Sequence, residues 1–586
     1  MQRNEITKKV EQIEKVSESP EQITQNIADV ISKFEIRGIL KNLDVLKRSG
    51  ALLSTIHMAL LILPFVGAAS VSALFKSGLN KVGEGRKDAY YEAKNNEMIN
   101  WRFLMMAIAK RFVYLLGNDK EGLSDKIQAV KAIIFDDSAI QKTGKSMECV
   151  GYVHDHVTDA HILGYKLLVC GFWDSGSFIP IDFSIHKEKR DGELKKIEGR
   201  IEKTNEKIKM AAKKVKGTTA LVKERKALSK EAKAKYAARP GKTNDDNLAR
   251  KQRGLDKARA SLLRDKGRLG ALKEKSGVLA DTLFELKANY RFCGLRQKDY
   301  KNQYKKKRKR GTPGHNRKKE TGESKNDTAI KMLKRAIRNG FVPDYVLTDS
   351  WFFCLKFLQA IIDIGRGVHL VSMAKIGTAK YTLLPSGDTL NPHQILAKYE
   401  RKSGKTSRKY KSRYLQFQAT YQGARVKIFL IRFGRNNKWR MLATTDLEIS
   451  FTKIMEVYAI RWAIEVFFKE CKQNLLLGKC QSKDFDAHIA DATLCMVRYI
   501  LLSYSERIHY GTTIGGLFRE LRQAAIEDNL LADINGYFFE LLIVCAEIAS
   551  IDFIGFYEEL LRNPKAEKLL GHIGLGQNKN PFLNVA

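Results

Sequence analysis

The order of the apolar segments constrains the fold of this 586-residue chain more than any other feature of its sequence. Short apolar runs predict five β-strands, at 131–138, 160–173, 177–186, 344–353 and 368–374. The pattern at 329–340, which Gly340 ends, predicts an amphipathic helix after the third strand, and a further helix precedes the fifth. The predicted order is therefore three strands, a helix, a strand, a helix and a strand.

This is the element order of an α/β ribonuclease-H-like core, which is the fold class that we expect. Four more strand-like runs lie within 378–447, and the chain is predicted to be helical from 450 to about 561. We divide the chain into a helical N-terminal domain (1–125), the first part of the core (126–186), a basic insertion with a loop (187–320), the second part of the core (321–377), a β-rich insertion (378–447), a core helix (448–510) and a C-terminal helical region (511–586).

The insertion after the third strand is strongly basic. Residues 187–320 contain 44 Lys and Arg against 17 Asp and Glu, which gives a net charge of +27 out of +39 for the chain. Apolar residues recur close to heptad spacing on both sides of a breaker stretch at 238–247. We therefore predict a long antiparallel helical hairpin over 190–285 with basic outer faces, followed by a flexible basic loop over 305–319.

So large a positive charge calls for a polyanion or an anionic membrane as partner, and nucleic acid is the better account of the basic insertion. The uncharged segment 49–75 is long enough to span a bilayer, but it contains Pro64 and several polar residues. We expect a buried helix pair that is broken at Pro64. A membrane-associated basic protein anchored by this segment is the less favoured alternative.

The cysteines and the first residues indicate the compartment. Eight cysteines without a C-x-x-C pair argue against a zinc ribbon or a disulfide framework and are typical of a reducing cytoplasm. The first 16 residues have no apolar signal core, so we expect a cytoplasmic protein. A hydrophobic fraction of 44% excludes a chain that is disordered throughout.

Two carboxylates follow predicted strands, at the position where an open α/β sheet presents its site. They are Asp136, with Asp137 as a competing choice, and Asp349. Two such carboxylates can share divalent ions, because hard cations prefer oxygen ligands. The segment 153–161 has three His and two Asp, but its spacing fits no metal-ligand pattern, and we interpret it as a polar turn.

A third acid is expected on the predicted helix at 458–476. At ~100° per residue, one face of this helix carries a carboxylate among cations: Tyr458, Arg461, Glu465, Lys469 and Lys472. Apolar residues lie on the opposite face. The alternative for this helix alone is a surface position with ion pairs between residues four apart, such as Arg461 with Glu465.

The spacing Tyr458-x2-Arg461-x3-Glu465-x6-Lys472 resembles the Y-R-E-K signature of bacterial insertion-sequence DDE transposases of the cut-and-paste type. The resemblance extends to Asp136-Asp137-Ser138 as the first acid, Leu347-Thr348-Asp349 as the second, and Trp462 directly after the signature arginine. Asp136 is preferred to Asp137 because a hydroxyl residue then follows two positions on. The resemblance covers about 35–510, and the basic hairpin is its main departure.

The resemblance implies a DNA transposase that cuts element ends and joins their 3′-hydroxyls to target DNA by two-metal phosphoryl transfer, with a hairpin intermediate. It implies two Mg²⁺ or Mn²⁺ ions held by Asp136, Asp349 and Glu465. The implied DNA contacts are Tyr458, Arg461, Trp462, Lys469, Lys472 and Trp439. Trp462 and Trp439 resemble aromatics that stack on a flipped base, although a core position suits Trp439 equally well.

The implied partner is double-stranded DNA, both element ends and target, bound by a homodimer of the chain with the N-terminal domain on the element end. The implied location is the bacterial cytoplasm in association with the nucleoid. No glycine-rich phosphate loop is present, so no small-molecule cofactor is expected. The alternative functions on this fold are a nuclease that does not transpose and an inactive DNA-binding relative.

Overall fold

The structure is a computed structural model. It describes residues 29–43, 50–76, 85–118, 130–188, 192–288, 292–434, 438–508 and 513–523, together with 544, 548, 552, 559 and 562–565. Most of the predicted C-terminal helical region therefore lies outside the described residues. The chain divides into two compact units, a larger one formed by Met1–Lys187 with Gln303–Ala586 and a smaller one formed by Glu188–Asn302.

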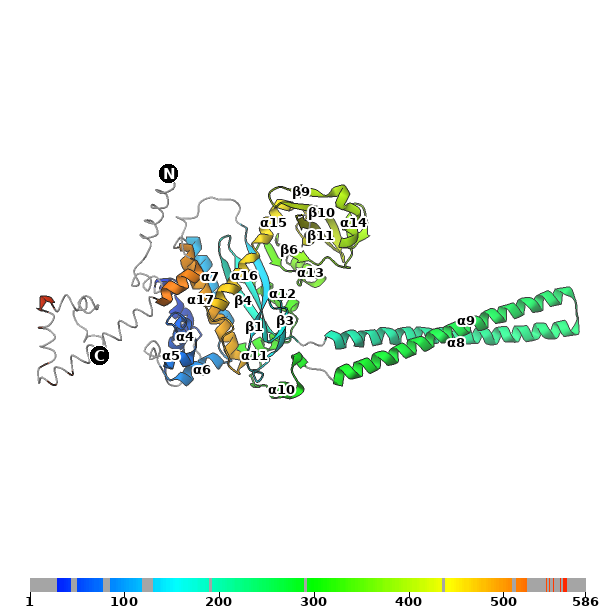
Figure 1. Cartoon of the computed structure of the whole chain (residues 1–586), viewed down its shortest axis with the longest axis horizontal. Helices are drawn as coiled ribbons and strands as arrows, with labels where there is room; N and C mark the ends of the chain where they lie inside the picture. Colours follow the sequence, from blue (N-terminus) through cyan, green and yellow to red (C-terminus); the bar gives the residue numbers. More distant parts are fainter. Residues whose placement is uncertain are drawn as a thin grey trace. The chain divides into compact units, whose positions relative to one another are not determined.

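A mixed sheet forms the centre of the larger unit (Figure 1). Its central strand is β1 (Ala132–Gln141), with β5 (Tyr345–Thr348) and then β6 (His369–Ala374) parallel to it on one side. On the other side lie β3 (Ala160–Trp173) and then β4 (Phe178–His186), each antiparallel to its neighbour. All five predicted strands form, and the predicted mixed α/β fold is confirmed. Every residue of β4 is buried, as expected for a strand covered on both faces.

The register of these strands creates one edge at which acidic side chains can meet. β1 pairs with β5 only from Ala132 to Ile134, whereas its pairing with β3 continues to Gln141. We expected β1 to end at residue 138, directly after the acids. Instead, Asp136 lies within the strand, just beyond the point where the parallel pairing with β5 stops, because β3 continues to satisfy its backbone.

The predicted strands at 378–447 extend the same sheet. Beside β6 the strands follow in the order β12 (Arg440–Thr444), β11 (Ala424–Phe433), β10 (Ser412–Tyr421), β7 (Tyr381–Leu384) and β8 (Thr389–Leu390). A short strand, β9 (Lys405–Ser407), also pairs with β10. At the opposite end of the sheet, β2 (Gly151–Asp155) pairs with β3. The segment also contains α14 (Pro392–Ser403), which we did not predict. Its start is encoded locally, because Asn391 and Gln394 form a capping box ahead of it.

Helices cover the sheet. α12 (Lys325–Arg338) packs against β3 and β4 and meets α13 (Leu355–Ile364). α17 (Phe485–Ile508) is almost entirely buried and packs against α7 (Trp101–Asn118). Its buried polar side chains have partners on neighbouring segments, such as Asp486 with Lys306 and Arg498 with the end of the fourth helix.

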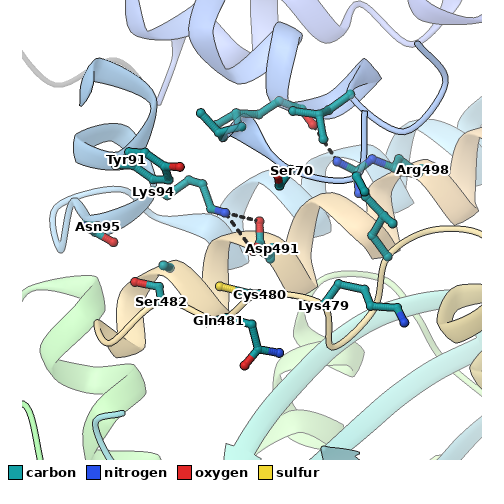
Figure 2. A pocket seen from close by; sticks show the side chains of 16 residues that line it. Ser70, Tyr91, Lys94, Asn95, Lys479, Cys480, Gln481, Ser482, Asp491 and Arg498 are labelled. Carbon is teal, nitrogen blue, oxygen red and sulfur yellow. Dashed lines mark hydrogen bonds and ion pairs between the residues drawn. The ribbon is translucent and has the colours of Figure 1, made fainter. Parts of the chain in front are cut away.

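The N-terminal helices are held to α17 by buried cations (Figure 2). They are α3 (Ile36–Lys41), α4 (Leu53–Ile62), α5 (Val71–Lys76) and α6 (Lys87–Asn95). The Arg498 guanidinium donates hydrogen bonds to the carbonyl oxygens of Leu60 and Leu61, at 2.6 and 2.7 Å, at the end of α4. These carbonyls have no partner within a helix that ends there, so the arginine satisfies them.

The uncharged segment 49–75 forms α4 and most of α5, separated by a turn that contains Pro64. This agrees with the predicted broken helix pair. Across the described ranges, no helix is both long enough and apolar enough to cross a membrane.

The smaller unit contains two antiparallel helices, α8 (Gly192–Ala238) and α9 (Lys242–Ala288), which lie side by side in Figure 1. Each has 47 residues. The buried side chains of α9 recur at alternating spacings of three and four, at Leu255, Ala258, Leu262 and Asp265, of which Leu262 is half-buried. This is the pattern of a two-stranded coiled coil.

The basic run at 305–319 is not the flexible loop that we expected. Pro313–Glu320 forms α11, which Thr312 caps, and the segment belongs to the larger unit. The Arg308 side chain is only 1% exposed, and its guanidinium contacts Glu148, Asp484 and Asp486 at 2.7, 3.1 and 3.0 Å. These acids lie far away in the sequence, so nothing local to the run indicated that its charge is compensated inside the fold.

Arg308→Ala should lower the free energy of unfolding of the larger unit by about 3–5 kcal/mol, because it leaves buried carboxylates without their main cation. Urea denaturation followed by tryptophan fluorescence measures the change. The exposed Arg310, two positions away, provides the matched control, and Arg310→Ala should change the stability by less than about 0.5 kcal/mol. Equal effects of the two substitutions would contradict the assignment of a buried ion cluster.

Candidate active site

The centre of the candidate site is an arginine between two carboxylates. Arg461 donates a hydrogen bond through Nη1 to Asp136 Oδ2 at 2.7 Å and another through Nη2 to Glu465 Oε1. The two acids come from elements far apart in sequence, because Asp136 lies on β1 and Glu465 on α16 (Trp462–Gln473). The arginine side chain is mostly buried between them, so the contact is shielded from solvent.

Burial and nearby negative charge raise the pKa of two aspartates of this site, Asp136 and Asp349. Burial, together with the charge of Asp349, raises the pKa of Asp136 to about 6, although Arg461 acts in the opposite direction. Burial also raises the pKa of Asp349, with a further contribution from Asp137. The ionised forms of Asp136 and Asp349 are therefore unfavourable in this environment, and additional positive charge close to them would stabilise these forms.

Asp349 follows β5 directly and is fixed by its neighbours. Its Oδ1 accepts a hydrogen bond from the backbone N–H of Trp351 at 3.0 Å, and its carbonyl oxygen accepts one from Ser372 Oγ at 3.0 Å. The Tyr458 hydroxyl lies 3.4 Å from the carbonyl oxygen of Thr348, the residue before this aspartate. Burial raises the pKa of Tyr458 to about 12, so its hydroxyl stays protonated near neutral pH.

Asp137 has a different environment from Asp136, as alternation along a strand requires. It pairs with Lys166 at 3.3 Å and Lys325 at 3.1 Å. Although burial acts against ionisation, these two cations hold the pKa of Asp137 below its ordinary value. The geometry therefore favours Asp136 over Asp137 as the first acid, since only Asp136 shares a cation with Glu465.

The predicted helix at 458–476 is divided in two. α15 (Phe451–Ala459) carries Tyr458, and α16 starts after Arg461. Between them, the N–H groups of Arg461, Ala463 and Ile464 bond to carbonyl oxygens three residues back, which is a tighter 3₁₀ turn. Such a turn needs no Gly or Pro, so no residue type in the sequence marks its position. The apolar face expected for the helix is buried, including Phe467 and Cys471.

The remaining predicted residues differ in their positions. Lys472 Nζ donates a hydrogen bond to Ser138 Oγ at 2.7 Å, and burial lowers the pKa of this lysine. Lys469 is exposed on α16, and Trp462 is 63% exposed. Trp439 is half-buried next to β12, with the Arg432 guanidinium 4.9 Å from its ring centre, so its surroundings are those of a packed side chain.

In the part of the chain that the structure describes, no three or more His, Cys, Asp or Glu side chains are grouped closely enough to hold a metal ion in this arrangement. At the predicted site, Arg461 occupies the facing oxygens of two of the three acids. The donor set still fits Mg²⁺ or Mn²⁺, because it consists of carboxylate oxygens that already accommodate a cation between them. The segment 153–161 forms the end of β2, a turn and the start of β3, as its interpretation as a polar turn predicted.

Sequence reasoning missed four residues that support the acids, Trp351 through its backbone N–H and the others through their side chains: Lys166, Lys325, Trp351 and Ser372. One of them had a visible signal. Lys166 is a single cation within the apolar run of β3, and a buried lysine requires an acidic partner on a neighbouring strand. The other three can be identified only from the fold, because no local sequence pattern marks them.

The structure also contains a cavity of about 390 Å³ away from these residues (Figure 2). α6, the loop that follows α16, and α17 line it. In Figure 2 Lys94 reaches toward Asp491, to which it is paired at 2.8 Å. None of the predicted site residues lines this cavity, and its cations serve contacts between helices.

Asp136→Asn should raise the free energy of unfolding of the metal-free protein at about pH 7.5 by about 1–3 kcal/mol, because it removes a buried charge. The pKa of this carboxyl is about 6 when folded against an ordinary value of 3.8, so protonation favours folding. Wild type therefore regains stability as the pH falls from 6 toward 3.8, and the difference from the variant should shrink. Urea denaturation of wild type and variant, at about pH 7.5 and again at a pH between 6 and 3.8, measures this difference in the free energy of unfolding.

For the adjacent acid, Asp137, we expect the opposite change in the free energy of unfolding. Asp137→Asn should lower the free energy of unfolding by about 3 kcal/mol, since it leaves the buried Lys166 without its carboxylate. If both substitutions destabilise the protein equally at neutral pH, the two acids do not have the distinct environments described above.

Comparison with known proteins supports the transposase resemblance. Residues 319–501 match the family described as Transposase DDE domain. The matched range includes Asp349 and the segment from Tyr458 to Lys472, but not Asp136. The chain is also similar to the cryo-EM structure of the piggyBac transposase synaptic complex with hairpin DNA, with 9% identity and a TM-score of 0.36 over 87% of this chain and 81% of that one. At that score the likeness carries no argument about the fold. No curated protein matches the chain.

Proposed function

We propose that the chain is a DDE transposase of the Y-R-E-K group that cuts the ends of a bacterial insertion sequence and joins them to target DNA. The observation that carries the proposal is the convergence of Asp136, Arg461 and Glu465 at the edge where Asp349 follows β5. The strand order β4-β3-β1-β5-β6, in which β3 runs opposite to the other four strands, supports a ribonuclease-H-like core as the framework.

In this proposal Asp136, Asp349 and Glu465 hold two divalent ions. When bound, such ions activate the attacking oxygen and stabilise the leaving oxygen of a phosphodiester. The raised pKa of Asp136 and of Asp349 supports this role, because a carboxylate that is costly to ionise alone gains most from a cation. Glu465 is the most accessible of the acids bound to Arg461, since its side chain is 37% exposed.

The other signature residues act on DNA backbone. Arg461 exchanges its two carboxylate partners for phosphate oxygens, which its planar guanidinium binds in the same bidentate manner. Lys472, fixed by Ser138, and the exposed Lys469 provide further positive charge along α16. The Tyr458 hydroxyl donates to a phosphate near Asp349, and the exposed Trp462 stacks on a base at the cut end, which suits a hairpin intermediate.

Asp136→Asn, Asp349→Asn and Glu465→Gln should each reduce Mg²⁺-dependent cleavage by a factor of at least about 10³, because each removes a ligand from the reacting centre. The substrate is linear DNA that carries the inverted repeats flanking the coding sequence, and products are resolved on denaturing gels. DNA binding, measured by fluorescence anisotropy, should persist in all three variants.

Glu470→Gln is the matched control, because Glu470 lies on the same helix and bonds to Asn474 instead of Arg461. Cleavage by Glu465→Gln at the wild-type rate would remove this residue from the site. Cleavage without any joining of 3′-hydroxyls to target DNA would indicate the nuclease alternative.

The smaller unit is proposed to bind DNA backbone. Residues 192–288 contain 28 Lys and Arg against 13 Asp and Glu. The buried positions of the coiled coil hold apolar and small residues together with Asp265, which leaves most cations on the outside. The remainder of the +27 lies mainly at 303–320, where Lys306, Arg308 and Lys318 are paired with acids inside the larger unit. The hairpin is therefore the more available part of this charge.

Replacing 192–288 by a short Gly-Ser linker should weaken DNA binding for all sequences and flatten its dependence on salt. Each lost phosphate contact reduces the log–log slope by about 0.9, so a change of several units is expected. Affinity is measured by anisotropy between about 50 and 200 mM salt. An unchanged slope, combined with loss of the dimer in sedimentation, would show that the hairpin joins two subunits instead.

A further inference from the structure

Two of the five tryptophans of the chain stand out by their exposure. Trp462 is 63% exposed and Trp351 is 44% exposed, whereas Trp101 is 3% exposed and Trp173 and Trp439 are half-buried. An exposed indole ring forgoes a large hydrophobic gain and offers a flat apolar face on which a ligand can stack. Both exposed tryptophans adjoin the carboxylate site, Trp462 next to Arg461 and Trp351 two residues after Asp349.

Trp351 is held firmly despite its exposure. Its backbone N–H donates to Asp349 Oδ1 at 3.0 Å, and its ring meets Phe352 edge-on at 5.3 Å. Phe352 is fully buried and packs in turn against Phe135 and Phe357. The indole is therefore anchored through the core of the sheet, and a rigid ring loses little entropy when a ligand stacks on it.

A lysine accompanies the ring. Lys325 Nζ lies 4.8 Å from the centre of the Trp351 ring, and it also pairs with Asp137 at 3.1 Å. The cation is fixed between an acid that is itself buried and the face of the indole, which is a favourable cation–π arrangement. Lys325 thus acts as a positioning residue for the ring.

We propose that Trp351 is a second nucleobase-stacking platform, on the side of Asp349, that receives an unpaired base of the DNA strand being cut. This inference deepens the proposed function and rests on it. Trp462 would stack another base next to Arg461, so the two stacking surfaces adjoin the acids from different elements, α16 and the segment after β5. A strand end opened at the scissile phosphate offers unpaired bases on both strands, and stacking is tolerant of base identity.

The test uses two DNA substrates in single-turnover assays. An intact duplex end gives the rate of nicking, and an end that is already nicked at the cleavage position gives the rate of the following joining step. Trp351→Ala should slow the joining step by about tenfold or more, whereas Trp351→Phe should retain most of the rate, since a phenyl ring still stacks. Removing the base that stacks, by an abasic nucleotide at that position, should restore the Trp351→Ala rate. A packing role for Trp351 predicts no such rescue.

The matched control is Tyr114→Ala on α7, since Tyr114 is also exposed and also has a cation, Arg111, over its ring at 5.1 Å. This control should leave both rates unchanged. Independently of catalysis, 2-aminopurine placed at the strand end and bound by Asp136→Asn protein should show a fluorescence change that Trp351→Ala abolishes.

Different results would overturn the proposed transposase function and the stacking role of Trp351. Wild-type protein that cleaves no flanking repeat with Mg²⁺ would overturn the proposed function and the stacking role together. Active wild type, with Trp351→Ala unaffected in both rates or slowed equally in both without abasic rescue, would overturn the stacking role alone.

Discussion

The arrangement of the candidate site depends on one interaction, the contact of Arg461 with Asp136 and Glu465. It joins the central strand to the helix that carries the signature. Without a cation, two partly buried carboxylates at this edge would repel each other, and the packing of α16 on the sheet would be opposed by that repulsion. The arginine therefore offsets this repulsion and keeps Asp136 and Glu465 close to each other.

The same principle of compensated buried charge recurs away from the site. Arg308 gathers three acids from distant segments, and Asp137 is held between Lys166 and Lys325. These clusters explain why the net charge of +39 overstates the positive charge available to a polyanion. Part of the basic run at 303–320 is used inside the fold, whereas the cations of α8 and α9 surround a narrow apolar core and remain outside.

Features of the fold that depend on residues close together in the sequence were predicted, whereas features that depend on distant residues were not. Strands such as β1 and β4, the broken helix pair at Pro64 and the turn at 153–161 have local patterns, and all were predicted. The pairing of β12 with β6 could not be predicted, because strand order in a sheet is a long-range property. For the same reason the burial of Arg308 was missed, since its partners lie more than a hundred residues away.

The candidate acids show the same division. The ends of predicted strands indicated Asp136 and Asp349, and the signature spacing indicated Arg461, Glu465 and Lys472. The preference for Asp136 over Asp137 came from the hydroxyl residue two positions on, and the fold adds a physical reason for it, the alternation of side chains along β1. Trp351 had no sequence signal, because its exposure depends on how the chain leaves β5.

The central claim is that Asp136, Asp349 and Glu465 together bind divalent metal, and iron-directed cleavage tests it most directly. Fe²⁺ bound in place of Mg²⁺ generates hydroxyl radicals in the presence of peroxide and ascorbate, which cut the polypeptide next to the ion. Mass spectrometry of the fragments should find cuts near residues 136, 349 and 465 that excess Mg²⁺ suppresses. Cuts confined to another segment, such as the histidine-bearing turn at 153–161, would contradict the account.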